Sequence, residues 1–449
     1  MATKTILGGV FTTDTDGNIG TGAMVSTENV GGLVIDTKVV GTLAQAFANS
    51  TKAAAAFGDG QVVELTKYDD IAELGLDDTV MSGLVKHHLE QFFTFAGDNQ
   101  RLFLTFTCST TDTSFSAVEK IQLASNGIID HIGVWTSEPI ATANGNAYVV
   151  SAGNVLGKLQ AQAEKIGGKI GVTNYGGNSP ANIIVNAGIV AGGTVDYKKL
   201  PDLTNLGFPK VSMLIGQPAS DDVHAISEGL GGAMVGNVGV ALGVLAIAPA
   251  DVSIAAVRYF NLSSVTTTAE LGFGKTTVDA ETHKFTADVS FTNIKSLGYT
   301  ERNDYLHKKG YIFYRDIEGI ENGVFFSSDQ TLDAESDYRL ITRCRVMHKS
   351  RRVVRQSLLQ YINDSFEVDS STGQLSATMI STIQDTILNA LDASMVQPGT
   401  TVPQISGRTC EIDEEQNVLE NDSLITSYSL VPKGTTAAIF NTEGFVTTV

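Results

Sequence analysis

The feature that most constrains this 449-residue chain is a local reversal of its charge. The formal net charge of the chain is −19, yet the segment Tyr338–Asn363 contains no acidic residue. We expect a helix over about Val346–Ile362, because apolar residues recur there at helical spacings on one side. The other side of that helix carries five basic residues: His348, Lys349, Arg351, Arg352 and Arg355. This pattern predicts either a solvated face or a docking surface for an acidic partner.

Short segments ahead of the basic helix have the pattern of strands. Tyr311–Ile317 and Gly323–Ser327 are rich in aromatic residues, and Gly319 and Asn322 between them favour a turn. The residues of Tyr338–Arg345 separate into two faces by period two. We therefore predict a third strand that runs directly into the basic helix.

The composition is that of a folded protein, with 42% hydrophobic and 18% charged residues. A chain of this length corresponds to about three domains. The acidic balance argues against nucleic acid as a general partner of the surface. Cys108, Cys344 and Cys410 are scattered without a paired spacing, which favours a reducing compartment and predicts no disulfide framework.

Most of the chain between residues 33 and 230 alternates between strand and helix patterns. We expect strands at Leu33–Val40, Val62–Leu65, Arg101–Thr107, Ile128–Trp135, Ala181–Ala187 and Val211–Ile215. We expect helices at Leu43–Phe57, Ile71–Leu74, Asp77–Phe95, Phe115–Ala124, Ala152–Ile166 and Asp221–Leu230. Such alternation predicts an α/β layer with helical crossovers.

One uncharged segment, Gly229–Ala250, is long enough to cross a bilayer. Its glycines, Asn237 and Pro249, and the absence of a flanking basic cluster, favour a buried helix and strand in a soluble core instead. The first residues of the chain have neither the apolar core nor the cleavage site of a secretion signal. We therefore expect no direct membrane insertion.

No motif in the sequence demands catalysis, a metal or a cofactor. Gly272–Thr277 resembles part of a phosphate-binding loop, but Ala269 stands where that pattern needs its first glycine. Gly229–Gly236 misses the spacing of a dinucleotide-binding loop, so we expect a close-packed helix there. His87 and His88 are adjacent on a predicted helix, so their side chains diverge and do not converge on one metal.

Two separated regions resemble the contractile tail sheath protein family of myophages, tailocins and contractile injection systems. The first is the run that begins at Tyr68-Asp69-Asp70-Ile71 and ends in the strand Arg101–Thr107. The second covers the C-terminal third of the chain. Its parts are the Asp337–Arg343 strand, the helix to Ile362, the exit Ser365-Phe366-Glu367, a helix near Thr378–Met395, and strands at Thr409–Asp413 and Ser423–Pro432.

The resemblance implies an α/β (α+β) fold in four parts. These are an N-terminal arm over residues 1–30, an outer α/β region over 31–295, an inner mixed-sheet domain over 296–434 and a C-terminal arm over 435–449. The arms are expected to add strands to the sheets of neighbouring subunits. The residues expected to make these contacts are Thr5, Ile6, Leu7, Val10 and Phe11 in one arm and Ala438, Ile439, Phe440 and Phe445 in the other.

The resemblance also implies a function. The chain is expected to be a non-enzymatic subunit that forms a helical homo-oligomer around a tail tube, with baseplate and terminator proteins as further partners. It would assemble in the bacterial cytoplasm and reside in a virion tail or injection particle. The five basic residues of the predicted helix are then candidates for docking to the tube. The acidic cluster Glu411–Glu415, with its neighbours Glu420 and Asp422, is either a surface loop or a complement for Arg351, Arg352 and Arg355, within one subunit or between neighbouring subunits.

Two alternatives from other classes stay open at this point. One is a nucleotide- or dinucleotide-dependent α/β enzyme that uses one of the glycine-rich segments. The other is a different self-assembling protein of a virion or a cell surface.

Overall fold

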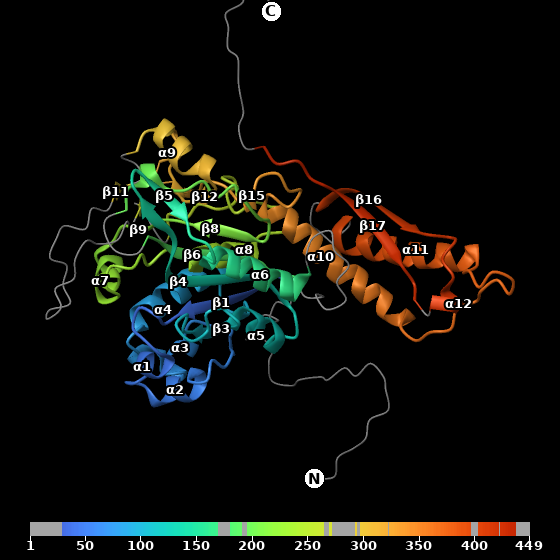
Figure 1. Cartoon of the computed structure of the whole chain (residues 1–449), viewed down its shortest axis with the longest axis horizontal. Helices are drawn as coiled ribbons and strands as arrows, with labels where there is room; N and C mark the ends of the chain where they lie inside the picture. Colours follow the sequence, from blue (N-terminus) through green and yellow to red (C-terminus); the bar gives the residue numbers. More distant parts are fainter. Residues whose placement is uncertain are drawn as a thin grey trace, which may run out of the picture.

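The computed structural model describes residues 29–168, 180–190, 195–264, 269–271, 292–293, 297–321, 323–396, 403–421 and 423–436. These residues form two bodies joined by the long helix α10 (Ile341–Leu358), as Figure 1 shows. We call the described residues up to Leu340 the large body and those from Ile341 onward the small body. The expected α/β class with helical crossovers is confirmed.

A mixed sheet forms the centre of the large body. Its strands lie in the order β12 (Tyr311–Ile312), β8 (Val211–Leu214), β6 (Asn182–Val190), β4 (Ile129–Asn144), β1 (Val30–Asp36), β3 (Leu102–Thr107) and β2 (Val63–Leu65), and β5 (Ala147–Val150) pairs with β4. Neighbours from β12 to β3 are parallel, whereas β2 and β5 are antiparallel to their partners. Every residue of β1 is buried, as expected for a parallel strand covered on both faces.

Helices cover both faces of this sheet. One face carries α4 (Ser82–Ala96) and α8 (Val238–Ile247), and the other carries α5 (Ala117–Ala124) and α6 (Val155–Gly167). Consecutive glycines of β1 show the alternation, because Gly31 faces Phe92 of α4 and Gly32 faces Ile121 of α5. The result is a three-layer α/β/α arrangement.

The uncharged segment contains the predicted buried helix, α8, but the strand predicted with it is absent from residues 229–250. Each residue of α8 from Val238 to Ala246 is buried, and its glycines allow close approach to α4. A Cβ on Gly239 would lie 2.2 Å from the carbonyl oxygen of His88. No helix in the described ranges is long and apolar enough to cross a membrane.

The glycine-rich segment before α8 is not the close-packed helix that we predicted. Helix α7 (Asp221–Gly229) ends there, and Gly231, Gly232 and Gly236 adopt positive φ angles. These backbone conformations belong to turns and are unfavourable for other residues. The segment is therefore a connection that turns the chain from α7 into the buried helix.

The remaining elements complete the two bodies. Around the large sheet lie α1 (Leu43–Ala46), α2 (Thr51–Phe57), α3 (Asp70–Glu73), η1 (Leu76–Asp78), η2 (Tyr197–Lys199), β7 (Asn205–Phe208), β9 (Gln217–Pro218), β10 (Ala269–Leu271), β11 (Thr292–Asn293), α9 (Tyr299–Tyr305), η4 (His307–Lys309), β13 (Tyr314–Arg315), β14 (Phe325–Phe326) and β15 (Leu332–Asp333). The small body continues with η5 (Leu359–Tyr361), α11 (Ala377–Leu391), η6 (Asp392–Val396), β16 (Ile405–Ile412), α12 (Val418–Asn421) and β17 (Thr426–Pro432).

The small body has a core of its own. Val346 and Val354 of α10 pack with Ile383 and Ile387 of α11 and with the buried ends of β16. β16 and β17 form an antiparallel pair, as the predicted closing strands require. By contrast, most of the buried apolar residues from Leu297 to Ile341 pack into the core of the large body. The hydrophobic cores thus divide within α10, and the boundary at residue 296 remains a prediction.

Two sequence predictions fail at helix starts. The single helix predicted at Leu43–Phe57 is two helices, because Ser50 accepts a hydrogen bond from the backbone of Ala53 and begins α2. The strand predicted at Tyr338–Arg345 is instead the beginning of α10 at Ile341. The predicted hairpin before it is present as β13 paired with β14.

Some sequence predictions lie outside the described residues. These are most of both predicted arms, at residues 1–28 and 437–449, and the phosphate-loop candidate at residues 272–277.

Candidate interaction site at the basic helix

Helix α10 crosses the edge of the large sheet at which β1, β4, β6 and β8 begin. In a parallel α/β layer the helices run opposite to the strands, so α6 and α8 end at this same edge. Helix carboxyl ends carry unpaired carbonyl groups and the negative pole of the helix dipole. Basic side chains on α10 are the electrostatic complement of that edge.

Arg345 closes the carboxyl end of α8. Its Nη2 donates to the carbonyls of Leu245 at 3.2 Å and Ala248 at 2.6 Å. Its Nη1 donates to those of Pro249 at 3.0 Å and Val252 at 3.3 Å. The residue is 4% exposed, and burial lowers the pKa of its guanidinium to about 10, which leaves it charged at neutral pH.

Two further cations meet the carboxyl end of α6. Arg351 Nη1 donates to the carbonyl of Gly167 at 2.6 Å. Lys210, which precedes β8, donates to the carbonyls of Ala163 and Gly168. Burial, together with the charge of Arg351, lowers the pKa of Lys210 to about 8. The positive charge of α10 thus stabilises two helix ends of the large body.

Arg352 connects α10 to the starts of two strands. It forms an ion pair with Asp130 and donates from Nη2 to the carbonyls of Ile129 at 2.9 Å and Pro180 at 3.1 Å. Because Asp130 lies in β4 and Pro180 precedes β6, one side chain links the small body to both strands.

The five predicted docking residues therefore have different environments. His348 is buried, Arg351 and Arg352 bond to the large body, Lys349 is half-buried, and Arg355 is exposed. Within the described residues of one chain, Arg351 and Arg352 make these contacts with the large body. Pairing of Arg351, Arg352 and Arg355 with the acidic cluster of a neighbouring subunit remains a prediction. Docking to a tube remains a prediction for this helix.

Sequence reasoning missed Arg345, Lys210 and Asp130. The signal for Arg345 was present, because it lies in the acid-free segment, but we placed it on a strand. Lys210 and Asp130 gave no local signal. Their roles depend on which helix ends and strand starts meet in the fold.

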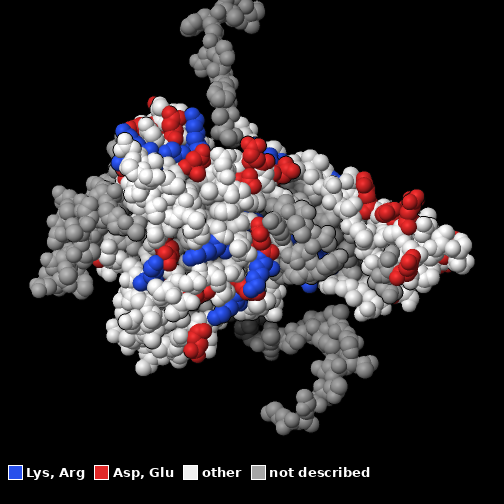
Figure 2. Space-filling view, in the orientation of Figure 1, with Lys and Arg blue, Asp and Glu red and all other residues white. Residues whose placement is uncertain are grey.

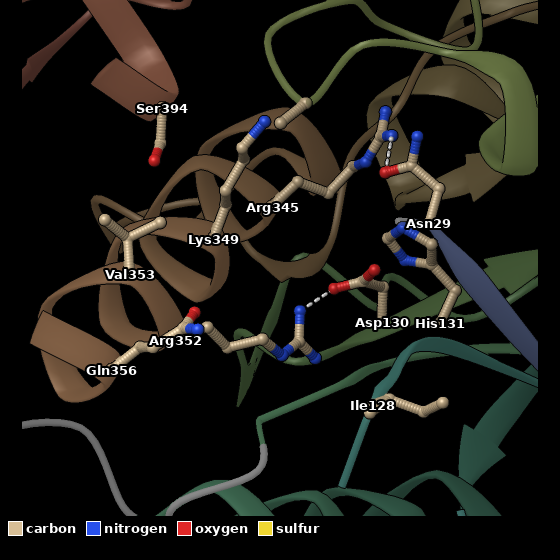
Figure 3. Close-up of a pocket in the computed structure, with 11 residues that line it drawn as sticks. Asn29, Ile128, Asp130, His131, Arg345, Lys349, Arg352, Val353, Gln356 and Ser394 are labelled. Carbon is tan, nitrogen blue, oxygen red and sulfur yellow. Dashed lines mark hydrogen bonds and ion pairs between the residues drawn. The ribbon is translucent and has the colours of Figure 1, made fainter. Parts of the chain in front are cut away.

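A cleft of about 290 Å³ lies beside these contacts, where the two bodies meet (Figure 3). Lys349, Arg352, Val353 and Gln356 of α10 form one wall of the cleft. The large body contributes Asn29, Ile128, Asp130, His131 and Ala250, the helix start contributes Arg345, and the small body adds Ser394.

The other histidine and cysteine candidates also lie in the described part of the chain. His87 and His88 lie on α4 with ring centroids 5.3 Å apart, and the His87 ring contacts the carbonyl of Gly236. Cys108 and Cys344 are buried free thiols, and Cys410 is a half-buried one. No group of three or more His, Cys, Asp or Glu residues in the described ranges could hold a metal ion.

Comparisons with known proteins found one matching family model and several solved structures of similar fold. Residues 337–447 match the family described as DUF2586, C-terminal domain. A chain of the anti-feeding prophage baseplate is similar at 10% identity and a TM-score of 0.53, covering 98% of this chain and 99% of that one. A chain of the PVC sheath complex in its contracted state, from an extracellular contractile injection system, is similar at 10% identity and a TM-score of 0.50, covering 100% and 99%. No curated protein sequence matches.

The chain has the fold of a contractile injection system sheath-like protein. The likeness to these solved structures extends over both bodies. The family match begins four residues before α10 and includes β17, so it corresponds to the small body. The small body, which begins with α10, is therefore the part of the chain that matches the family model.

Proposed function

We propose that this chain is a structural subunit of a contractile tail sheath, which polymerises helically around a tube and contracts to drive the tube through a target envelope. The observation that carries the proposal is the similarity of fold over almost the full length of both chains in two contractile injection structures. A helical polymer needs a contact between unlike surfaces that does not close into a ring. Contraction then exchanges one set of contacts for another and requires no cofactor.

The sheet of the small body supports assembly by strand exchange. In the described part of the chain, β16 and β17 pair only with each other, so each presents an outer edge. Unpaired backbone groups along an edge accept a strand from another chain. The proposed donors are the arms at residues 1–30 and 435–449 of neighbouring subunits.

The proposal includes the other components of such a particle. A tube protein, baseplate proteins and a terminator protein are the proposed partners, with assembly in the bacterial cytoplasm before incorporation in the particle. Within this proposal, contact with the tube involves Arg355, the exposed basic residue of α10. Among the described residues, no feature favours the enzymatic alternative.

Electron microscopy of the purified chain tests the proposal. We expect the full chain to form tubes or stacked rings, and chains that lack residues 1–25 or 435–449 to remain soluble and unpolymerised. The truncated chains should keep the circular dichroism spectrum of the two bodies, since each cut removes almost only residues beyond the described elements. Discrete particles from the full chain, or polymers from both truncated chains, would contradict the proposal.

A further inference from the structure

Two buried histidines lie on opposite sides of the junction between the bodies. His131 belongs to β4 of the large body and lines the cleft (Figure 3), whereas His348 lies on α10. His131 is 2% exposed and His348 is 4% exposed. Both ring nitrogens of His131, and Nδ1 of His348, have no hydrogen-bond partner among the described residues. These nitrogens therefore have no acceptor that would favour a protonated ring.

The charged groups that act on the two rings are cations. Arg345 lies beside His131, and its strand neighbours Gly31 and Asn182 carry no charge. The cations beside His348 are Lys210 and Arg351. The acidic side chains around these cations bond elsewhere: Asp130 to Arg352, Asp251 to Lys433, Asp329 to Thr342 and Glu164 to Gln160. A proton on either ring would thus place a second positive charge beside one that is already there.

The junction can open while each body keeps its own core. Among the described residues, Ala250 is the only large-body residue in the core of the small body, and Ile341 is the only small-body residue in the other core. Many contacts of α10 with the sheet edge are instead hydrogen bonds to backbone carbonyls. Water replaces such bonds when α10 moves away. A local opening of this kind requires less free energy than global unfolding.

We propose that His131 and His348 form a pH-sensitive switch, in which protonation of both rings releases α10 from the edge of the large sheet while both bodies stay folded. Burial and the adjacent cations keep the rings neutral in the closed junction. In the open junction water surrounds the rings, and their pKa values return to about 6.5. The closed junction is therefore most stable above pH 6.5 and weakens as the pH falls below it. This inference does not depend on the proposed sheath function.

Cys344 is a natural reporter of this opening. It lies one helical turn before His348, is fully buried, and its Sγ–H donates to the carbonyl of Pro209 at 3.5 Å. Burial raises the pKa of this thiol to about 12, so it is unreactive while the junction is closed. Cys108 is buried in the large body directly after β3, so its thiol reports unfolding of that body.

Thiol labelling of the full chain at pH values from 8 to 5 tests the switch. Mass spectrometry gives the rate at each cysteine, which is divided by the rate of a free cysteine peptide at the same pH. Each ring that is protonated only in the open junction raises the open population by about 30-fold over this range. We expect the relative rate of Cys344 to rise by about 900-fold in the wild type and by about 30-fold in His348→Gln. Cys108 should be labelled more slowly than Cys344 throughout.

His87→Gln is the matched control. His87 is also a buried histidine, but it lies on α4 and contacts the carbonyl of Gly236 at the start of α8, the opposite end of that helix from Arg345. Because α4 stays folded when the junction opens, the rise at Cys344 in His87→Gln should equal that of the wild type. His131→Gln carries the same expectation as His348→Gln and replaces it if that variant does not fold.

Two outcomes overturn the proposal. If Cys344 is exposed only by global unfolding, His87→Gln and His348→Gln reduce its rise equally, and Cys108 is labelled as fast as Cys344. If the rise at Cys344 is the same in the wild type and in His348→Gln, protonation of that ring does not open the junction.

Discussion

At the scale of single residues, Arg345 is a charged side chain that the fold buries almost completely. A buried guanidinium is stable only when its charge and its N–H groups are matched, and here the match comes from carbonyls at the end of α8. We expect Arg345→Met to reduce the free energy of unfolding by about 2–4 kcal/mol, because those carbonyls would lose their donors. Urea denaturation of the two chains measures the difference.

Arg355→Met is the control for this prediction. It makes the same change on the same helix at an exposed position, and we expect an effect within about 0.5 kcal/mol. If the two substitutions destabilised the chain equally, Arg345 would not be the cap that its hydrogen bonds indicate.

Arg345 also shows what the sequence could predict at this scale. The acid-free segment correctly marked α10 as the place where the chain uses positive charge. The partners are backbone carbonyls about 100 residues earlier in the chain. Backbone groups have no sequence signature, so a solvated or docking face and a buried cap have the same local pattern.

At the scale of elements, the contact between α4 and α8 depends on glycine. A Cβ on Gly239 would lie 2.2 Å from the carbonyl oxygen of His88, which belongs to the backbone and cannot rotate away. We expect Gly239→Ala to force the helices apart and cost about 1–3 kcal/mol. The midpoint of urea unfolding should fall accordingly.

Gly229→Ala is the control in the same experiment, and we expect it not to lower the stability of the chain. Gly229 is the last residue of α7, and a Cβ there would meet no atom within 4 Å. Alanine favours helix over glycine by about 1 kcal/mol in a helix interior, and less at an end, so this variant should be unchanged or slightly more stable. A stabilising Gly239→Ala would show that the close approach of α4 and α8 is not required.

The start of α10 explains why one element was predicted wrongly. Leu340 precedes the helix and offers no capping side chain. The cap comes from Asp329, whose carboxylate accepts the backbone N–H of Thr342 at 3.4 Å and its hydroxyl at 3.0 Å. Because Asp329 lies 13 residues earlier, the local alternation favoured a strand. By contrast, α6 was predicted well, since its apolar face and its cap Asn154 are adjacent in sequence.

At the scale of the whole molecule, the small body divides its charges between α10 and the elements that follow it. Figure 2 shows acidic side chains on the small body, while basic and acidic side chains intermingle on the large body. The two basic residues that follow α10 are both paired, Arg408 with Asp392 and Lys433 with Asp251. Within the small body, the positive charge of α10 is therefore used at the junction, and the negative charge lies on the residues that follow α10. The net charge of the chain could be read from the sequence, but the contacts that use the charge of α10 could be found only from the folded structure.

Buried histidines predict how the whole molecule responds to acid. Burial lowers the pKa of His87 to about 4 and the pKa values of His88, His131 and His348 well below their usual range. These rings are neutral in the folded chain but accept protons below about pH 6.5 once it unfolds. The stability that they confer is complete above pH 6.5 and declines as the pH falls from 6.5 toward 4. Each ring contributes a slope of about 1.4 kcal/mol per pH unit.

Unfolding by urea at pH values from 8 to 5 measures this slope, in a range where most carboxylates stay ionised in both states. His87→Gln keeps a donor for the carbonyl of Gly236 but cannot titrate. Its slope should be smaller than that of the wild type by about 1.4 kcal/mol per pH unit, while the two chains differ little at pH 8. A profile that stays flat between pH 6.5 and 5 would mean that the rings are protonated inside the folded chain. Arg345 would repel a protonated His131 ring, and Arg351 would repel a protonated His348 ring. A flat profile would therefore contradict the close positions of these cations and rings in the structure.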